Sequence, residues 1–386
     1  MDLTFTPAQV ELRERARAFA EKVLADGARY RDEHARFSEA IIQKLAGAGF
    51  LGFTIAKALG GLGYDLRGFT EAIREISRVD AGIALILISH SLLCQTALAQ
   101  WGSEQQKNKY LPRLANGEIL ASYAIQDNQY GSSHLQSVAT TAHRDGDQYR
   151  LNGTKAWISH GESARLFFVF ARSGEKSGGD DVSMYMIEKD REGLTASPQA
   201  DLLGLRSAGL SKLELAECVV PLDHRLGEEG AGRKIAGQLE LLNNIGLAAQ
   251  ALGITEAALE KSVSYAKQRR QFNRFIAEFE VIQDKLADIG TNFEAARSIT
   301  SQAAADVDAG NTAPTLASMA KLFATTTAMN AANEAVQIHG GYGYLKEHGI
   351  ERLMRDAKVM EIFGGSAETQ RAFIAHKLLN REHFSN

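Results

Sequence analysis

The chain has 386 residues, 45% apolar and 23% charged, a composition typical of a globular protein with several buried cores. Its net charge of -4, without a basic stripe, excludes a nucleic-acid-binding surface. The two cysteines lack metal-ligand spacing, which excludes a disulfide framework and predicts a reduced, cytoplasmic setting with no bound metal.

The first 120 residues have the pattern of helices. Thr6-Pro7 resembles an N-cap followed by proline at the first helical position, and no export signal is visible around it. The longest apolar run, 84–88, is too short to cross a membrane, so we expect no membrane contact. Apolar residues at helical spacing predict further helices over 38–45, 69–101 and 104–114, with a glycine-rich loop at 59–64.

From 121 to 230 the pattern changes to short strands separated by turn signals. Residues 148–151 predict a strand that ends in a tight turn at Asn152-Gly153. Three more strands are expected over 166–170, 182–187 and 213–220. Several short strands of this kind indicate a small all-β domain.

From 231 to 386 alanine-rich helical patterns return. They predict helices over 234–270, 276–308, 313–338 and 367–380, which would form a bundle. We therefore expect an α+β fold with an N-terminal α-helical domain (1–120), a middle β-barrel domain (121–230) and a C-terminal four-helix bundle (231–386).

Four segments in this order resemble the acyl-CoA dehydrogenase superfamily. They are 151–159 (LNGTKAWIS), 269–272 (RRQF), 337–344 (QIHGGYGY) and 354–358 (MRDAK). The resemblance covers nearly the whole chain and implies an oxidoreductase with FAD as its cofactor. Because the family shares FAD between subunits, it also implies a homo-oligomer, with a tetramer as the usual state.

The resemblance implies a set of cofactor contacts. Trp157 and Ser159 would lie beside the flavin, although by themselves they would be interpreted as a buried strand tryptophan and a surface serine. Arg269 would reach the pyrophosphate of a neighbouring subunit, and its guanidinium fork suits phosphate oxygens. Glycines after 337–339 would let the backbone approach the cofactor, although glycine is also a common helix cap. The remaining implied contacts are Ile125, Gln126, Gly131, Ser132, Gln271, Phe272, Phe279, Gln337, Gly340, Gly341, Ser366 and Glu368.

The catalytic base is where this sequence departs from the family pattern. Relatives remove a Cα proton with a glutamate, because a thioester Cα–H is a very weak acid. The usual base position is Gly364, and the position used by a second branch is Asn243, followed by Asn244 in place of an arginine. The catalytic residue is therefore unknown, and Glu361 and Glu240 are the nearby acids that could have taken over. The loop at 126–133 also loses the family's terminal aspartate.

Three functions remain open. The first is an oxidoreductase of specialised metabolism that acts on an acyl thioester carried by CoA or an acyl carrier protein. Its electrons would pass to an electron-transfer flavoprotein or to oxygen. The second is a flavin-dependent monooxygenase on the same fold, for example one that N-hydroxylates an amino sugar, which needs no Cα base. The third is a catalytically inert flavin-binding homologue.

Overall fold

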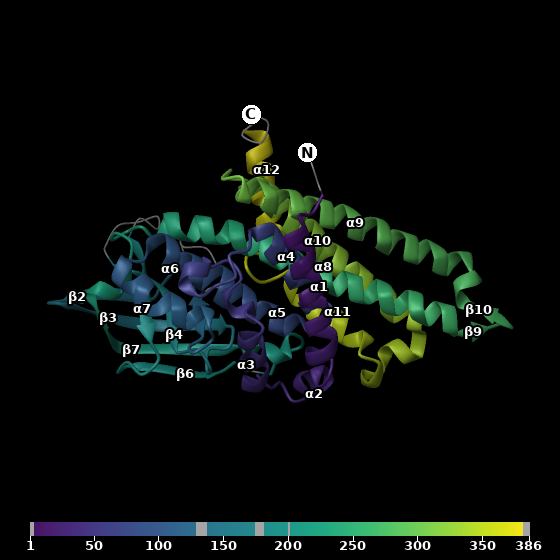
Figure 1. Ribbon diagram of the computed structural model, residues 1–386, viewed down its shortest axis with the longest axis horizontal. Helices are drawn as coiled ribbons and strands as arrows, with labels where there is room; N and C mark the ends of the chain where they lie inside the picture. The colour runs from purple at the N-terminus through teal and green to yellow at the C-terminus, as the bar shows by residue number, and fades with distance from the viewer. Residues whose placement is uncertain (1–3, 129–136, 174–180, 200, 381–386) are drawn as a thin grey trace.

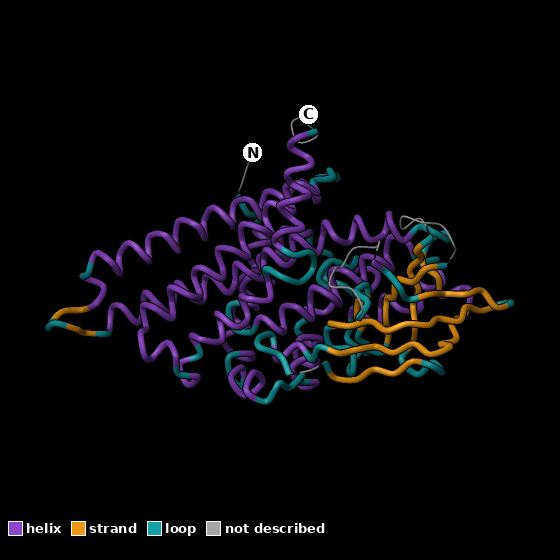
Figure 2. The backbone as a smooth tube through the Cα atoms, turned by 180° about the vertical axis from the view of Figure 1, so that it is seen from behind, coloured by secondary structure: helices purple, strands orange, loops and turns teal. Residues whose placement is uncertain are grey.

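The computed structural model describes residues 4–128, 137–173, 181–199 and 201–380. The sheet occupies one end of the molecule and a small hairpin, β9–β10, the other, with long helices running between them (Figure 1). Figure 2 shows the same separation from behind, with the strands gathered at one end. The expected order of helical, β and helical domains is confirmed.

Helices make up the N-terminal domain. Thr6 caps the first helix, and its hydroxyl accepts from the backbone N–H of Gln9 while the Gln9 side chain accepts from the Thr6 amide. The helices are α1 (Pro7–Phe19), the π-helical η1 (Ala20–Leu24), α2 (Ala28–Glu33), α3 (Glu39–Gly47), α4 (Leu66–Ser77), α5 (Ala81–Leu87), the π-helical η4 (Ile88–Cys94), α6 (Gln95–Trp101) and α7 (Glu104–Ala115).

The helix expected over 69–101 is two helical stretches. Asp80 has extended backbone, and its carboxylate accepts from the N–H of Ile83, so a new helix begins after it. The second stretch, Ala81–Trp101, is long and apolar enough to span a membrane by length and composition, but it is 94% buried inside the protein. It is a core element of this fold.

The middle domain is one eight-stranded sheet with the order β6-β7-β3-β2-β4-β5-β8, and β1 pairs with β4. Pairings of β4 with β1 and β2 are parallel, and the other pairs are antiparallel. The strands are β1 (Ala121–Ala124), β2 (Thr141–Asp145), β3 (Gln148–Ile158), β4 (Leu166–Arg172), β5 (Val182–Glu188), β6 (Leu194–Pro198), β7 (Ser211–Pro221) and β8 (Arg225–Leu226).

The turn expected at Asn152-Gly153 is wrong. Strand β3 runs straight through both residues, and the turn that joins it to β2 contains Gly146, whose φ is 62°. A Cβ on Gly153 would lie 2.5 Å from the hydroxyl oxygen of Thr140 and 2.8 Å from its Cα. Glycine is therefore needed here for close backbone approach within the sheet rather than for a chain reversal.

Within its described residues the C-terminal domain has five α-helices: α8 (Gly232–Gln268), α9 (Glu280–Asp308), α10 (Pro314–His339), α11 (Ile350–Met360) and α12 (Ala367–Leu379). The sequence patterns gave no helix at α11, and they extended α8 and α9 into residues 269–279. That stretch instead contains the hairpin β9 (Arg270–Gln271) and β10 (Arg274–Phe275), followed by the short 3₁₀ helix η8 (Ile276–Glu278). Phe272 and Asn273 form its turn with φ of 51° and 62°.

Segment 354–358 joins the three domains. Arg355 donates to both oxygens of Asp32 in α2, at 3.0 and 2.6 Å, and to the carbonyl of Leu203 in the middle domain. Asp356 accepts from the N–H of Leu205 at 2.6 Å. Burial raises the pKa of Asp356 to about 7, against the nearby charge of Arg352. This motif of the sequence therefore has a structural role at a domain junction.

Helices α4 and α8 cross in close contact at Gly253. A Cβ at this position would meet the carbonyl oxygen of Arg74 at 2.4 Å and the Cβ of Ser77 at 2.6 Å. The Ser77 hydroxyl also donates to the carbonyl of Gln250 at 2.6 Å. The crossing anchors the first long helix of the C-terminal domain to the N-terminal domain.

Two glycine substitutions in α8 should therefore have opposite effects. Gly253→Ala should lower the free energy of unfolding by about 1–3 kcal/mol, because the methyl group overpacks the crossing. Gly237→Ala is the matched control, since nothing lies within 4 Å of a Cβ there. It should raise the free energy of unfolding by about 0.5–1 kcal/mol through helix propensity. Chemical denaturation measures both, and equal effects would contradict the close crossing.

Candidate functional site

Trp157 stands on a strained part of β3. Its φ is 62°, a left-handed backbone that costs a bulky residue about 1–3 kcal/mol. The pairing with β7 is irregular between Lys155 and Ile158, and the ring is 53% exposed while both of these neighbours are buried. The strand thus holds a large aromatic face outward at a local energetic cost, which is typical of a binding site.

Residues 125–128 pair with β3 beside this tryptophan. The N–H of Ala156 donates to the carbonyl of Gln126 at 3.0 Å, and the N–H of Asn128 donates to Thr154 at the same distance. Ile125 and Gln126 are half-buried, and Gln126 pairs with Ala156, the residue before Trp157. Gly131 and Ser132 lie outside the described residues.

A buried ion pair fastens this segment, and the sequence patterns did not single it out. The ammonium of Lys155 lies 2.8 Å from Asp127 Oδ2 and 3.0 Å from the carbonyl of Ile125. Both charged side chains are almost fully buried. Burial lowers the pKa of Lys155 to about 8, although the Asp127 charge opposes the shift. Asp127 also accepts from the backbone N–H groups of Ala139 and Thr140.

Ser159 is tied to β1 and is mostly buried. Its carbonyl accepts from the hydroxyl of Ser122 at 2.6 Å. The next residue, His160, donates from Nε2 to the carbonyl of Ala121, whose N–H in turn donates to Nδ1 of His90. Burial lowers the pKa of His160 to about 3 and that of His90 to about 4, so both imidazoles are neutral at physiological pH. They hold β1 in place and add no charge.

A second group of expected cofactor residues lies around the β9–β10 hairpin. Arg269 follows α8, and its guanidinium lies over the ring of Tyr342, 5.4 Å from the centroid. Gln271 is exposed, and Phe272 is 87% exposed at the tip. The seven-residue spacing of Phe272 and Phe279 predicts that both lie on one face of a helix. This prediction is wrong, because Phe279 precedes α9 and Phe272 lies in the hairpin turn, but their rings still meet edge-on at 6.2 Å.

Gln337, Gly340 and Gly341 lie at the end of α10, near this hairpin. All three are exposed, and a Cβ on either glycine would meet nothing within 4 Å. His339 is packed, as expected: its Nδ1 donates to the carbonyl of Ala335 and its ring stacks on Tyr265 at 4.3 Å.

The sheet that carries Trp157 and the β9–β10 hairpin lie at opposite ends of the molecule (Figure 1). Helix α8 runs between the sheet and the hairpin, and 37 residues at 1.5 Å each give it a length of about 55 Å. Its first residue packs on Val182 of the sheet, and its last precedes Arg269. The Arg269 group therefore lies at the hairpin end of α8, away from the sheet that carries Trp157.

The two expected base positions do come together. A Cβ on Gly364 would lie 2.8 Å from Nδ2 of Asn243 and 2.7 Å from Cδ1 of Leu247. Gly364 and Gly365 have φ of 64° and 91°, which disfavours any side chain there. Among the described residues, neither position offers a carboxylate.

Lys321 of α10 holds this glycine loop. Its buried ammonium donates to the carbonyls of Phe363 at 2.8 Å, Gly364 at 2.6 Å and Gly365. Burial lowers its pKa to about 7, against the charge of Glu240. All three of its N–H donors are used by the loop, so its role is to position the backbone. The sequence signal for it is a lysine inside an otherwise small and apolar helical pattern.

Ser366, Glu368 and Glu361 flank the loop. The Ser366 hydroxyl accepts from the N–H of Thr369 and caps α12. The pKa of Glu368 is lowered by hydrogen bonds from its own amide and from Ser366. Glu361 forms an ion pair with Lys358 at 3.0 Å.

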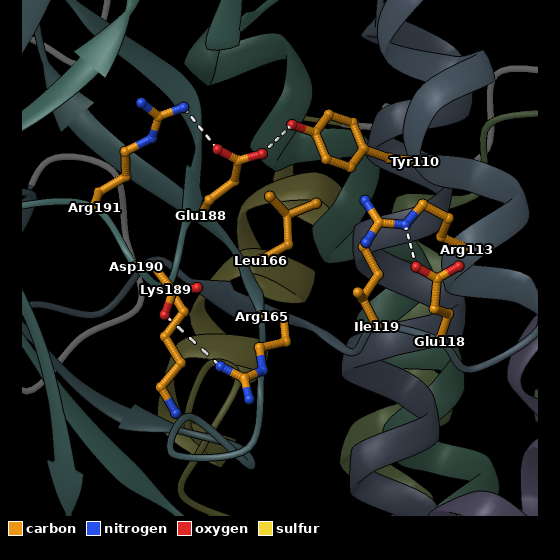
Figure 3. Close-up of a pocket in the computed structure, with 10 residues that line it drawn as sticks. All are labelled: Tyr110, Arg113, Glu118, Ile119, Arg165, Leu166, Glu188, Lys189, Asp190 and Arg191. Atoms are coloured by element: carbon orange, nitrogen blue, oxygen red, sulfur yellow. Dashed lines mark hydrogen bonds and ion pairs between the residues drawn. The ribbon is translucent and has the colours of Figure 1, made fainter.

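A separate pocket of about 600 Å³ lies between α7 and the ends of β4 and β5 (Figure 3). Its charges pair with one another: Arg113 with Glu118 at 2.7 Å, and Glu188 with Arg191 and the Tyr110 hydroxyl. It contains none of the expected cofactor residues, and its charges are largely satisfied internally.

Comparison with known proteins identifies the family. Models of the N-terminal, middle and C-terminal domains of acyl-CoA dehydrogenase match residues 6–118, 122–218 and 231–379. An acyl-CoA dehydrogenase of Bacillus subtilis is 40% identical over 97% of this chain and 98% of its own length. The chain belongs to the acyl-CoA dehydrogenase family.

Solved structures agree with this assignment. Butyryl-CoA dehydrogenase from Megasphaera elsdenii superposes with a TM-score of 0.95 at 35% identity, over 98% of this chain and 100% of that one. A prolyl acyl carrier protein oxidase has a TM-score of 0.93 at 33% identity, over 97% and 100%. A chain described with the electron transferring flavoprotein of Acidaminococcus fermentans has a TM-score of 0.96 at 36% identity, over 98% and 100%.

The protein is thus an FAD-dependent oxidoreductase of the acyl-CoA dehydrogenase type. Its residues fit the cofactor. The exposed Trp157 ring on strained backbone offers a flat face, and the open backbone at Gly340 and Gly341 allows close approach. Arg269 offers a guanidinium at the other end of the chain.

Removing the buried ammonium beside Trp157 should release residues 125–128. Lys155→Met leaves the Asp127 carboxylate buried without its counter-charge, so the free energy of unfolding should fall by about 3–5 kcal/mol. Arg150→Met in the same strand breaks only exposed ion pairs, with Asp145 and Glu217, and should cost about 0–1 kcal/mol. Urea denaturation of both variants tests this. Similar losses of stability in the two variants would show that the Lys155–Asp127 ion pair does not hold residues 125–128.

Proposed function

We propose that this protein oxidises an acyl thioester carried by CoA or an acyl carrier protein, with chemistry that departs from its family's usual proton abstraction. FAD, when bound, accepts the hydride that leaves the substrate. The carrier assignment draws on the relatives, which include both a butyryl-CoA dehydrogenase and a prolyl acyl carrier protein oxidase. We infer a cytoplasmic location and an electron-transfer flavoprotein or oxygen as the acceptor.

The separation of the two cofactor groups supports a shared cofactor. A flavin beside Trp157 of one protomer would receive Arg269, Gln271 and Phe272 from another, with Gln337, Gly340 and Gly341 at the same end as these. The 87% exposed Phe272 ring favours such a contact, since a large apolar side chain at a tip is usually covered by a partner. We therefore propose a homo-oligomer, with a tetramer as the expected state.

One observation carries the departure from standard chemistry. Gly364 and Asn243 face each other at the place where the family's base would act, and both lack an ionisable side chain. The ammonium of Lys321 donates to three carbonyls of the loop and so fixes its backbone. The Asn243 amide is then the polar group that remains beside Gly364. The site can orient a thioester there, but it supplies no strong base at either position.

The direct test mixes the anaerobic holoprotein with a panel of acyl-CoA and acyl-pantetheine thioesters. Bleaching of the flavin absorbance by at least one of them is expected. A flavin that stays oxidised with every thioester would contradict the proposed function.

The missing base also favours a second candidate, a flavin-dependent monooxygenase, because that chemistry needs no Cα base. Oxygen uptake by externally reduced enzyme with a trapped hydroxylated product would support it. A reduced enzyme that gives no oxygenated product with any candidate substrate, amino sugars included, would remove it. The third function, an inert flavin-binding protein, remains only if both assays are negative and the protein still binds FAD.

A carboxylate can be restored at one base position more readily than at the other. Asn243→Glu lies within regular helix α8 and should increase the rate of butyryl-CoA dehydrogenation by about 10²-fold or more, as expected for a positioned base. Gly364→Glu should fail to do so and should destabilise the protein, because its backbone is left-handed and its Cβ would lie 2.7 Å from Leu247. Single-turnover flavin reduction and thermal melting measure both. A Gly364→Glu variant that is more active than Asn243→Glu would contradict the backbone geometry at residue 364.

A further inference from the structure

A short loop joins α11 to α12 around the base position Gly364. The N–H of Ala367 donates to the carbonyl of Glu361 at 2.9 Å and closes this loop. The carbonyls of residues 363–365 all accept hydrogen bonds from the ammonium of Lys321 in α10. The loop therefore carries three consecutive carbonyls whose shared partner is a single side chain.

Lys321 is buried without a counter-charge. Only 1% of the residue is exposed, and it forms no ion pair within the part of the chain that the structure describes. The other buried ammonium of this site differs, because Lys155 lies 2.8 Å from the carboxylate of Asp127. A buried charge without a partner of opposite sign is costly, so the three carbonyls are the groups that favour the charged form of Lys321.

The ionisable groups on the helices around Lys321 do not replace that partner. Burial lowers the pKa of Lys321, and the charge of Glu240 on α8 opposes this shift only in part. Helices α9, α11 and α12 also pack on α10, and the buried residues of α9 and α12 are all neutral. The buried acid of α11, Asp356, accepts from Leu205 of the middle domain. Glu361 pairs with Lys358 on the protein surface.

The number of N–H donors on Lys321 matches the number of carbonyls. An ammonium has three N–H donors, and each carbonyl of residues 363–365 takes one. A neutral amine has two N–H donors and a lone pair, so one carbonyl would lose its hydrogen bond and face the lone pair. A buried acceptor without a donor is costly, and the loop would move until that carbonyl met another donor or water.

We propose that the protonation of Lys321 controls the position of the loop 363–365. The loop keeps its described position while the side chain is an ammonium, and it moves when the side chain is a neutral amine. The effect on the reaction rests on the proposed function, since Gly364 and Asn243 meet where the thioester would be oriented. Lys321 is then a positioning residue, and thioester binding weakens as rising pH removes its proton.

Hydrogen exchange of the FAD-bound protein tests the loop directly. Peptides that cover residues 361–368 are followed from about pH 6 to about pH 9, with labelling times scaled to the intrinsic exchange rate at each pH. Protection of the loop amides, which include that of Ala367, should fall about 10- to 100-fold, as the loss of one buried hydrogen bond allows. The midpoint should lie at pH 7 or above, because burial lowers the pKa of Lys321 to about 7 and the carbonyls favour the ammonium.

Lys321→Met should remove this pH response. Its loop should exchange as fast at low pH as the wild-type loop does at high pH, because residue 321 then has no donor at either pH. Thr325→Val is the matched control: it removes a buried hydroxyl one turn along α10, where Thr325 donates to the backbone carbonyl of Lys321, and it leaves the ammonium in place. This control should keep the wild-type response. If Lys321→Met does not fold, the wild-type pH series decides alone.

Thioester binding connects the loop to the site. Acetyl-CoA is the probe, because it has no Cβ hydrogen and cannot be dehydrogenated. Its dissociation constant, measured from the flavin absorbance of the holoprotein, should rise about 10-fold over the same pH range in the wild type and stay constant in Lys321→Met. A relocated base would have the opposite signature, since flavin reduction by butyryl-CoA would then become faster as the base loses its proton.

Three results would overturn the proposal: a wild-type loop whose protection does not change with pH, a Lys321→Met loop that keeps the change, or a Thr325→Val loop that loses it. A loop that responds while acetyl-CoA binds equally at every pH would overturn the positioning role. If thioesters reduce the flavin and the loop does not respond, only this inference fails. If the loop responds and no thioester binds or reduces the flavin at any pH, the proposed function fails and the control of the loop stands.

Discussion

The buried contact between Lys155 and Asp127 sets the position of the strand that carries Trp157. Two charges without solvent are tolerated only when each is fully satisfied. Here the ammonium reaches the Asp127 carboxylate and the Ile125 carbonyl, while the carboxylate collects N–H donors from 139–140. Segment 125–128 is thereby fixed against β3. The adjoining bulge can then hold Trp157 in a left-handed conformation that an unsupported strand would relax.

A second buried lysine has a comparable role at the loop that contains Gly364 and Gly365. Lys321 satisfies three consecutive carbonyls at a loop whose glycines have positive φ. The positive φ of residue 364 therefore disfavours any side chain there, whatever the chemistry of that side chain. The glycine at 364 and the amide at 243 lie in contact, because a Cβ at 364 would be 2.8 Å from Nδ2 of Asn243.

Helix α8 connects the sheet to the β9–β10 hairpin. Its middle crosses α4 closely at Gly253, its first turns face the sheet, and its end leads to Arg269. Because this helix carries Arg269 away from the sheet, it supports the proposed sharing of FAD between protomers.

The sequence by itself determined the domain order, most helix and strand positions, the family and the cofactor, because periodicity and local motifs encode these. The cap at Thr6 and the packed His339 were also predictable, since each depends on residues within one or two turns. It could not determine the course of β3 through Asn152-Gly153, where contact with Thr140 rather than local turn preference decides. It also missed α11 and the Phe272-Asn273 turn.

Only the tertiary structure decided which distant residues meet. Asp127 and Lys155 are 28 residues apart, and Lys321 is 42 to 44 residues from the carbonyls it binds. Such pairings are fixed by the packing of whole domains, so charge complementarity and burial, not sequence spacing, define this site.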